Sequence, residues 1–413
     1  MKTFKLGGVH PKENKLSANK PIEVLTIPNQ VSILVSQHLG VPANVLVERG
    51  DKVKIGQLIA KGEAFISANI HSSVSGTVKK IDKIIDASGY AREAVIIDVE
   101  GNDWEEGIDT SNTIIKECKF DSTQIIEKIK EKGVVGLGGA AFPSHVKLMP
   151  PKDKKADYLI INSVECEPYL TADHQLMMEK AKEIIIGVTI LMKGLGAKKA
   201  LIGIENNKPD AIKHLTELTN DHINIEVHAL KVKYPQGAEK QLIKALVGRE
   251  VPSGKLPIEV GCVVNNVGTA YAVYEAVQKN KPLIERVVTV TGKSVKNPCN
   301  LLVRVGTPIS SLIEKAGGIP EDTGKIIGGG PMMGKALSSI EVPVTKGTSG
   351  ILLMDEEESK RDIIQNCIRC AKCTIVCPMG LEPYQLALQC DIADWEGAEK
   401  NNVMDCIECG SCQ

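Results

Sequence analysis

Seven of the twelve cysteines in this 413-residue chain form two runs near its carboxyl end. The first run has the spacing C-x-x-C-x-x-C-x-x-x-C-P and consists of Cys367, Cys370, Cys373 and Cys377. The second run repeats the first three positions as Cys406, Cys409 and Cys412. Thiolates at these intervals bind a four-iron, four-sulfur cluster within one compact loop. The spacing therefore predicts two iron–sulfur clusters.

The fourth cysteine of such a run, set apart and followed by proline, ligates the neighbouring cluster in proteins that hold two clusters. By that rule Cys377 completes the cluster of the second run. The fourth ligand of the first cluster should lie about four residues beyond Cys412, by extrapolation from the first run. The sequence ends at Gln413. We therefore expect this chain to stop inside its second cluster motif.

A zinc site is the main alternative, because paired C-x-x-C units also bind zinc. Zinc needs only two close thiols from each unit, whereas both runs place a third thiol at the same further interval. A disulfide framework fits the spacing less well. Cys390 lies between the runs with no matching spacing, and we expect it to be a small buried residue.

The charge balance excludes some classes of protein. Lysine and arginine number 50 against 51 acidic residues, and aromatic residues make up 3% of the chain. This composition disfavours binding to nucleic acid or to an anionic membrane surface. The first ten residues do not resemble a secretory signal, and the longest apolar run, 184–192, is too short to span a bilayer. We expect a soluble protein of a reducing compartment, or one held at a membrane only through partners.

The first 101 residues consist of short alternating runs separated by glycine and aspartate, which predicts a β-rich domain. The pattern resembles the lipoyl/biotinyl carrier barrel, which bears a modified lysine on a hairpin. The corresponding hairpin here, 63–71, contains no lysine, so we expect a structural or docking role. His71 is a candidate ligand, but the alternative is an ordinary hydrogen-bonded histidine.

The middle of the chain alternates between helical and strand patterns, which predicts an α/β domain with a largely parallel sheet. A helical pattern begins at about Thr123. The expected strands are 157–162, 199–204, 223–230 and 261–269, with Val287–Gly292 closing the unit. The expected helices are 171–193, 209–218, one after Tyr234 and one from Tyr271. Such sheets place ligands at the carboxyl ends of their strands, where Asn162 and the segment 164–168 lie.

Two polar segments of this domain can bind a ligand. Gly136-x-Gly138-x-x-Ala141 is a weak dinucleotide signal, because it follows a helical pattern instead of a strand, and a plain turn is the alternative. Asn265 and Asn266 can hydrogen-bond the edge of a flavin or simply cap the following helix. The spacing alone does not decide between these alternatives.

The segment between this domain and the cysteines is short. Residues 304–318 and 325–334 predict a small β-grasp-like insert, with 328–331 as a loop. Residues 355–358, which precede the cysteine runs, are acidic, and we expect them to begin a solvated helix.

Three blocks together resemble the flavin- and NADH-binding subunit of respiratory complex I: residues 136–147, 162–168 and 265–269. The residues that match that family are Gly136, Gly138, Gly139, Phe142, Lys147, Asn162, Glu165, Glu167 and Glu239. The departures are Leu137 for arginine, Ala141 for glycine, Val164 for aspartate and Tyr169 for glycine. The resemblance implies an FMN site, and the departures concern the NADH contacts more than the flavin.

The order of domains resembles the RnfC family, the peripheral subunits of bacterial Rnf ferredoxin–NAD oxidoreductase complexes. The resemblance implies a multidomain α/β protein. Its expected parts are a lipoyl-like β barrel-sandwich over 1–110, a Rossmann-like FMN/NADH domain over 120–292, a β-grasp domain over 293–345 and an α-helical, two-cluster ferredoxin-like domain over 355–413, cut short at its end.

The resemblance also implies the function. Electrons would pass between NAD(H), FMN and two four-iron four-sulfur clusters at the cytoplasmic face of the membrane. The partners would be the other Rnf subunits, with ferredoxin as an indirect partner and no transmembrane segment in this chain. Flavin is needed because hydride carries two electrons and a cluster accepts one.

The cofactor-binding set implied by the resemblance also includes Asn265, Asn266 and Thr269. Phe142 should pack near the nicotinamide or flavin plane, and Lys147 should offset phosphate charge. Glu165 and Glu167 should orient nicotinamide or ribose, the alternative being a solvated loop, and no residue is needed as a general acid or base. Two other functions stay open: a related flavin/iron–sulfur reductase serving a soluble partner, such as a cobalamin or proline reductase, and a non-catalytic adaptor that carries clusters.

Overall fold

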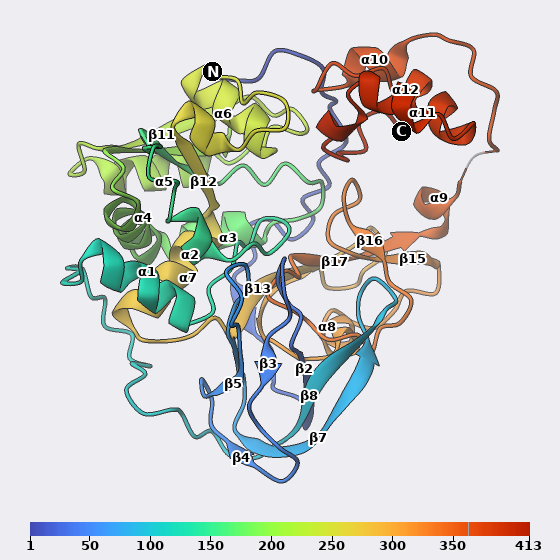
Figure 1. Ribbon diagram of the computed structural model, residues 1–413. Helices are drawn as coiled ribbons and strands as arrows, with labels where there is room; N and C mark the ends of the chain where they lie inside the picture. The colour runs from blue at the N-terminus through green and yellow to red at the C-terminus, as the bar shows by residue number, and fades with distance from the viewer. Residues whose placement is uncertain (362) are drawn as a thin grey trace.

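The computed structural model describes residues 1–361 and 363–413, so the expected cluster domain, 355–413, is described except for residue 362. Figure 1 shows a β domain at the bottom, an α/β unit at upper left, a second sheet at centre right and a helical module at upper right. Apart from the long N-terminal segment, the chain visits these parts largely in sequence order.

The N-terminal domain is β-rich, as predicted. One antiparallel sheet has the order β2-β8-β7-β4 and a smaller one the order β3-β5-β6. The strands are β2 (Gln30–Leu34), β3 (Asn44–Val45), β4 (Lys52–Val53), β5 (Leu58–Lys61), β6 (Ile70–His71), β7 (Gly76–Ile85) and β8 (Ala91–Val99). Apolar side chains from both sheets, among them Ile33, Ile59 and Ile97, form one core. His71 is buried, and burial lowers the pKa of its imidazole well below the usual range.

The α/β unit contains a four-stranded parallel sheet of order β11-β10-β9-β12, which confirms the predicted parallel arrangement. Its strands are β9 (Tyr158–Asn162), β10 (Lys199–Glu205), β11 (Ile225–Leu230) and β12 (Cys262–Asn266). Its helices are α1 (Ser122–Glu131), α2 (Ser144–Lys147), α3 (Ala172–Glu179), α4 (Ala181–Leu195), α5 (Pro209–Thr219), α6 (Glu239–Val247) and α7 (Val267–Gln278), with a 3-10 turn η1 (Pro257–Val260). The central strands are largely buried and apolar because helices cover both faces of the sheet.

Two helix predictions in this unit were wrong in detail. The single helix expected over 171–193 is broken at Lys180, whose φ of −123° is not helical, so α3 and α4 are separate helices. The helix expected from Tyr271 starts four residues earlier, because Asn266 caps it. Apolar periodicity marks the buried face of a helix, but it does not mark a break or a first turn.

The second sheet has the order β1-β14-β13-β17-β15-β16. Its strands are β1 (Ile22–Val24), β13 (Glu285–Thr291), β14 (Cys299–Arg304), β15 (Thr323–Gly328), β16 (Lys335–Ala336) and β17 (Gly350–Asp355), and α8 (Ile309–Lys315) packs against them. The strand expected to close the α/β unit, Val287–Gly292, lies instead in this sheet as β13. It pairs with β14 and β17, which come later in the chain.

The short helix α9 (Glu356–Ser359) packs against β15 and β17 of the second sheet. The C-terminal module that follows is helical: α10 (Lys372–Val376), α11 (Pro383–Asp391), α12 (Trp395–Lys400) and a 3-10 turn η2 (Val403–Asp405). Its small core includes Cys377, Leu381 and Leu386. The expectation that Cys390 is buried was wrong, because this residue lies on the exposed side of α11. Asp355 caps α9, which confirms the predicted helix start.

The first twenty residues form an extended segment that crosses the molecule. Lys2 pairs with Leu230 and Val9 with Tyr234, both in the α/β unit. The N–H of Gly8 donates to the carbonyl of Val376 at 2.8 Å. The segment therefore runs between the α/β unit and the C-terminal module, as the blue trace in Figure 1 shows.

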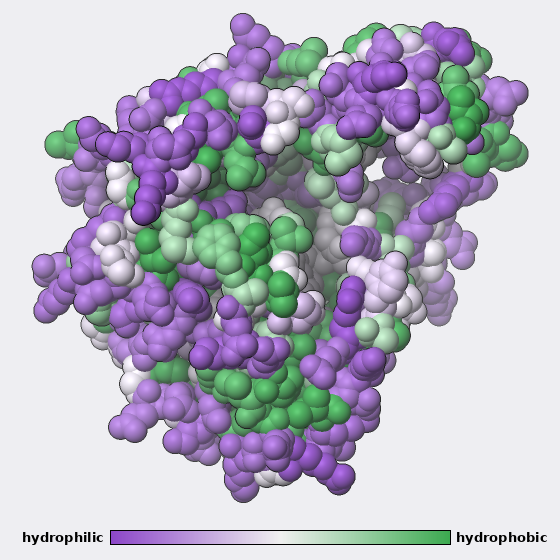
Figure 2. All heavy atoms as spheres, in the orientation of Figure 1, coloured by the Kyte–Doolittle hydropathy of each residue, from purple (hydrophilic) through white to green (hydrophobic). Residues whose placement is uncertain are grey.

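Within the described residues, no helix combines the length and the hydrophobicity needed to cross a bilayer. Hydrophilic side chains cover most of the face drawn in Figure 2, with apolar patches near the middle and near the bottom, the latter over the β domain. The same view shows a hollow near the middle of this face, bordered by the α/β unit and the C-terminal module.

The packing of α4 on α7 gives a test of the fold. A Cβ at Gly187 would overlap the carbonyl of Ala270, so the two helices can approach this closely only with glycine here. We expect Gly187→Ala to destabilise the protein by about 1–3 kcal/mol. Gly194→Ala is the matched control on the same helix: the nearest atoms to its Cβ would belong to side chains, beginning with Cγ2 of Ile125 at 3.1 Å, and helix propensity partly offsets that contact. Thermal unfolding should show a clearly lower midpoint for Gly187→Ala, and equal midpoints would contradict this packing.

Candidate functional site

The predicted binding residues gather at the point where the strand order of the parallel sheet reverses. From β9 the chain builds β10 and β11 on one side, and then returns to place β12 on the other side. Asn162 ends β9 and pairs with Asn266, which ends β12. Open α/β sheets bind ligands in the crevice at such a point, outside the carboxyl ends of the strands.

The glycine loop packs against the end of β12 and the first turn of α7. The N–H of Leu137 donates to Oγ1 of Thr269 at 2.9 Å, and the N–H of Gly136 donates to the carbonyl of Phe142 at 2.8 Å. A Cβ at Gly138 would come within 2.9 Å of Cβ of Asn266. Gly138 is therefore required for the close approach of the glycine loop to the end of β12. A plain turn would not need a glycine at this position.

Gly139 differs from Gly138. A Cβ added to Gly139 would meet no atom of the described chain within 4 Å. The outer part of the loop thus borders open space, with its backbone available to a ligand.

The two asparagines have different roles. Oδ1 of Asn266 accepts from the N–H groups of Gly268 and Thr269, at 2.8 and 3.3 Å, so it caps α7. Asn265 is 4% exposed, and its Nδ2 has no hydrogen-bond partner among the described residues. A buried amide left without a partner is costly, and this donor lies near the end of β12, where the crevice begins. The capping alternative is thus correct for Asn266, while Nδ2 of Asn265 has no partner among the described residues.

Lys147 and Glu239 meet across the same crevice. Nζ of Lys147 lies 3.3 Å from Oε1 of Glu239 and donates to the carbonyl of Val264 at 3.0 Å. Nδ2 of Asn162 donates to the carbonyl of Gly237 at 2.8 Å. The ends of β9 and β12 and the start of α6 are therefore joined by residues that the sequence singled out.

The carboxylates of Glu165 and Glu167 both accept backbone N–H groups. Glu165 accepts from Asp173 at 2.7 Å and His174 at 3.1 Å, at the start of α3. Glu167 accepts from Met332 and Met333, at 3.1 and 2.9 Å, in the turn between β15 and β16. Burial raises the pKa of Glu167. Neither carboxylate lies in a solvated loop, and Glu167 joins the α/β unit to the second sheet.

Sequence reasoning missed the cations beneath the glycine loop. Arg286, on β13, is 7% exposed and donates to the carbonyls of Lys346 and Leu137, at 2.6 and 3.4 Å. Nζ of Lys346 donates to the carbonyls of Asn69 and Gly133, both at 2.8 Å. Burial lowers the pKa of Arg286 to about 10 and that of Lys346 to about 7. An arginine directly before the apolar strand 287–290 was the one sequence signal for this network.

Lys15 was also missed. Its Nζ donates to the carbonyls of Glu165, Glu167 and Leu170 at 2.9, 2.9 and 2.6 Å. Burial lowers the pKa of this ammonium group. The N-terminal segment thus fixes the loop that follows β9.

The two cysteine runs have the same backbone conformation. Arg369 and Glu408, which occupy equivalent positions, have φ values of 56° and 52°, and Ala371 and Gly410 have values of 59° and 72°. The N–H groups of Arg369 and Glu408 donate to the Sγ atoms of Cys367 and Cys406, both at 3.4 Å. Left-handed conformations are costly for residues other than glycine. Their repetition at matching positions indicates loops shaped to present thiolates to a ligand.

The four thiols predicted to share the second cluster are neighbours. Burial raises the pKa of Cys412, and the charges of Cys409, Cys377 and Cys406 raise it further. Among the described residues, no three His, Cys, Asp or Glu side chains are close enough to hold a single metal ion. The thiolates of a cubane bind separate iron atoms, so they stand farther apart than the ligands of one zinc ion.

The second thiol set adjoins the α/β unit. The hydroxyl of Tyr234 donates to the carbonyl of Cys409 at 2.8 Å, and Nε2 of Gln241 donates to the carbonyl of Pro378 at 3.3 Å. Both donors belong to the loop and helix that follow β11. Each run has two exposed thiols, Cys367 and Cys370 in the first and Cys406 and Cys412 in the second, while Cys377 and Cys409 are buried. Exposure thus does not distinguish the runs, but the contacts of Tyr234 and Gln241 place the loops of Cys409 and Cys377 against the α/β unit.

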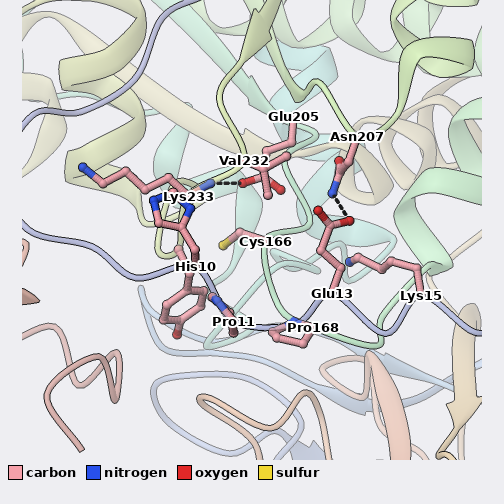
Figure 3. A pocket seen from close by; sticks show the side chains of 11 residues that line it. His10, Pro11, Glu13, Lys15, Cys166, Pro168, Glu205, Asn207, Val232 and Lys233 are labelled. Carbon is pink, nitrogen blue, oxygen red and sulfur yellow. Dashed lines mark hydrogen bonds between the residues drawn. The ribbon is translucent and has the colours of Figure 1, made fainter.

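A cavity of about 260 Å³ lies beside the crevice, under the N-terminal segment. Figure 3 shows Cys166 near its centre, with Glu205 and Lys233 at its wall. Oε1 of Glu205 accepts from the N–H of Lys233 at 3.2 Å, and burial raises the pKa of Glu205 to about 7. Burial also raises the pKa of Cys166 to about 12, so this thiol stays protonated and unreactive.

Comparisons with known protein families match the β domain, the α/β unit and the second sheet separately. Residues 2–102 match the RnfC barrel sandwich hybrid domain, residues 129–275 the Nuo51 FMN-binding domain, and residues 287–336 the SLBB domain. Three relatives are named as subunits of ion-translocating oxidoreductase complexes. The protein of Clostridium ljungdahlii, named for a proton-translocating ferredoxin:NAD(+) oxidoreductase complex, is 47% identical over 415 residues, which cover 98% of this chain and 88% of that protein.

The relative from Acetobacterium woodii is named for a Na(+)-translocating ferredoxin:NAD(+) oxidoreductase complex. It is 44% identical over 408 residues, covering 98% of this chain and 90% of its own length. The relative from Rhodobacter capsulatus, named for an ion-translocating oxidoreductase complex, is 39% identical over 403 residues, covering 96% of this chain and 77% of its own length.

The buried carboxyl of Glu205 gives a prediction about pH. Its pKa is raised on folding from 4.5 to about 7, so the folded state binds a proton more tightly than the unfolded state. Stability contributed by that proton is present below pH 4.5 and is lost as the pH rises toward 7. Glu205→Gln has no carboxyl group to titrate, so its stability does not show this loss. Between pH 5 and 7 the difference in free energy of unfolding should therefore shift in favour of the variant by at most about 1.4 kcal/mol per pH unit.

The control is Glu217→Gln, an exposed carboxylate on α5. Its difference from the native protein in thermal midpoint should stay constant from pH 5 to pH 8. A constant difference for Glu205→Gln as well would show that Glu205 is already ionised in the folded protein at pH 5.

Proposed function

Because this chain belongs to the RnfC family, whose members are subunits of ion-translocating ferredoxin:NAD(+) oxidoreductase complexes, we propose that it carries electrons between NAD(H), FMN and two four-iron four-sulfur clusters. One observation carries the proposal. The residues that the sequence analysis singled out lie around one crevice, and the loop of the second cysteine run packs beside it. The chain is an oxidoreductase subunit whose partners are the other subunits of the complex.

The residues of the crevice fit FMN. The free Nδ2 of Asn265 suits the carbonyl- and nitrogen-lined edge of a flavin, and the open space at Gly139 leaves backbone N–H groups for phosphate. Lys147 supplies positive charge at the same rim. The match to an FMN-binding domain over 129–275 includes all of these positions. We assign the site to Gly136, Gly138, Gly139, Phe142, Lys147, Asn162, Glu239, Asn265 and Thr269, with Asn266, Glu165 and Glu167 holding its framework.

The chemistry is a change from paired to single electrons. When bound, FMN takes a hydride equivalent from NADH and passes electrons on singly. The residues of this chain orient the reactants and exclude water. Phe142 is half-buried at the rim of the crevice, where its ring can stack on a planar ligand. Lys147 and the loop N–H groups balance phosphate charge, and no side chain is needed as a general acid or base at the transferred hydride.

The seven thiols are the cluster ligands in this proposal. Cys406, Cys409, Cys412 and Cys377 hold one cluster, and Cys367, Cys370 and Cys373 belong to the other. Matching left-handed residues in both loops support two clusters of one kind. The third thiol at the same interval in both runs favours cubanes over zinc, which needs only two close thiols from each run.

The contacts set an order for the two clusters. The cluster held by Cys377 and the second run is the one next to the flavin unit, because Tyr234 and Gln241 bind its loops. The cluster of Cys367, Cys370 and Cys373 is then the outer one, which exchanges electrons with a partner. Electrons from NADH follow that order, and electrons from reduced ferredoxin follow it in reverse.

The outer module carries apolar side chains suited to a protein partner. Those more than 60% exposed in this module are Ile363, Ile364, Ile368, Ile375, Ile392, Trp395 and Met404. Large exposed apolar groups gathered on one module mark a surface that another protein covers. We place this chain at the cytoplasmic face of the membrane, attached through the other subunits of the complex.

Two other functions have weaker support. A reductase with a soluble partner would use the same crevice and clusters, but the match over 2–102 is to a domain named for RnfC. A cluster-bearing adaptor without flavin would have no use for the free donor of Asn265. Reduction of an artificial acceptor by NADH, together with a flavin absorbance band, separates the enzyme from the adaptor.

The free amide of Asn265 gives a test of the flavin site. Replacing a buried amide that lacks a partner by an apolar group of similar shape is neutral or stabilising. We therefore expect Asn265→Leu to keep or raise the thermal midpoint of the flavin-free protein, while FMN affinity falls about tenfold, or about 1.4 kcal/mol. Fluorescence titration with FMN measures the affinity. Asn112→Leu, in an exposed loop, is the control and should change neither quantity. Unchanged FMN affinity in Asn265→Leu would place the flavin elsewhere.

Iron content tests the ligand assignment. Reconstituted full-length protein should hold about eight irons, four for each cubane. Cys377→Ser should lose about four of them and keep the electron paramagnetic resonance signal of the other cluster. Cys390→Ser is the matched control, an exposed thiol outside both runs, and should keep the full content. Full iron content in Cys377→Ser would contradict the assignment, and zinc in place of iron would overturn both clusters.

A further inference from the structure

The N-terminal segment fills the seam between the α/β unit and the C-terminal module. On one side, Val9 and Tyr234 exchange two backbone hydrogen bonds, at 2.8 and 2.9 Å. On the other side, the N–H of Gly8 donates to the carbonyl of Val376 at 2.8 Å. Adjacent residues of one short segment therefore bind two different parts of the molecule.

Gly7 packs directly against the backbone of a predicted cluster ligand. A Cβ added at Gly7 would overlap the carbonyl group of Cys377 and come within 2.6 Å of the carbonyl oxygen of Val376. The φ of Gly7 is 61°, in the left-handed region that favours glycine. The close contact with Cys377 and the backbone conformation both require glycine at this position.

The segment is also anchored closely to the α/β unit. A Cβ at Gly8 would come within 2.9 Å of the ring of Phe4 and of the carbonyl oxygen of Tyr234. Phe4 is 3% exposed, and Nζ of Lys233 lies 4.3 Å from the centre of its ring. Residues 4–9 are therefore fixed to the loop that follows β11.

The same loop contacts the other half of the inner cluster site, the one assigned to Cys377 and the second run. The hydroxyl of Tyr234 donates to the carbonyl of Cys409 at 2.8 Å. The helices α10, α11 and α12 pack chiefly against one another, so loop contacts of this kind hold the module to the α/β unit. The distance from the crevice to the inner cluster therefore depends on how closely these loops approach.

That distance matters for the proposed function, because the rate at which an electron tunnels between two centres falls steeply as the gap widens. One NADH supplies two electrons, which pass singly from the crevice to the two clusters, and its proton is released to water. The inner cluster takes each electron first. A module displaced from the α/β unit would slow this step and leave the reaction with NADH unchanged.

We propose that Gly7 is a positioning residue for electron transfer: because it has no side chain, residues 4–9 can hold the backbone of Cys377, and with it the inner cluster, close to the α/β unit. This inference rests on the proposed function for the electrons and for the order of the clusters. It assigns a role to an N-terminal segment that the flavin and cluster sites do not use.

The test variant is Gly7→Ala, whose Cβ must push the segment away from Cys377. Gly254→Ala is the matched control: Gly254 lies in an exposed turn with a φ of 65°, and a Cβ there would meet no atom of the described chain within 4 Å. Both variants place alanine in the left-handed conformation, and only Gly7→Ala adds an overlap.

The first measurement uses full-length protein loaded with FMN and iron and mixed with NADH in the absence of oxygen. Absorbance follows bleaching of the flavin, and electron paramagnetic resonance of rapidly frozen samples follows reduction of the clusters. Gly7→Ala should keep the native iron content and the native rate of bleaching. Its clusters should be reduced about tenfold more slowly, so that bleached flavin accumulates. Gly254→Ala should match the native protein in every respect.

The second measurement is amide hydrogen exchange and needs no cofactor. In Gly7→Ala the N–H groups of Gly8 and Tyr234, which bond across the seam, should exchange about tenfold faster than in the native protein. Gly254→Ala should leave both unchanged.

Native rates of cluster reduction or of exchange in Gly7→Ala would overturn the proposal. Equal slowing in Gly254→Ala would also overturn it, since backbone strain alone would then explain the effect. Loss of iron from Gly7→Ala would overturn it in favour of a role in forming the cluster. Native protein whose flavin NADH does not bleach would refute the proposed function instead, and hydrogen exchange would still decide whether Gly7 holds the module.

Discussion

Arg286 and Lys346 are buried cations and Lys15 is a half-buried one, and the partners of all three are mostly backbone carbonyls. The loops that border the crevice turn their carbonyls inward, where water cannot reach them. Each carbonyl left without a donor would cost about 1–3 kcal/mol. The donors come from elsewhere: Lys15 from the N-terminal segment, and Arg286 and Lys346 from the second sheet and the loop before β17. The crevice therefore has its shape only when these distant parts of the chain are assembled around it.

This dependence explains which features the sequence could predict. The cysteine runs, the glycine loop and the parallel strands are local, because spacing and periodicity within a few residues determine them. Cys406 and Cys409, or Gly136 and Gly138, belong to motifs that lie within one short stretch of the chain. Their identification needed no knowledge of the rest of the fold.

Features that depend on distant contacts could not be predicted in this way. β13 follows the α/β unit in sequence but lies in the other sheet, because its partners β14 and β17 come later. Arg286, at the start of that strand, reaches the glycine loop across a separation of 149 residues from Leu137. The expectation for Cys390 came from residue type alone, while only the packing of α11 decides which face is exposed. Sequence pattern therefore found the groups assigned to the ligand site and missed the cations Lys15, Arg286 and Lys346 that bind the carbonyls of its loops.

The loop from Ser163 to Pro168 shows why the holding groups matter for function. On one side Glu165 meets α3 and a groove beside Asp210. On the other side Cys166 accepts the N–H of Gly237 at 3.3 Å, in the segment whose Tyr234 binds the loop of Cys409. A single loop thus separates a polar face that contains titratable groups from a face that adjoins the thiols. Because Lys15 binds the carbonyls of Glu165 and Glu167 in this loop, the N-terminal segment stabilises both faces at once.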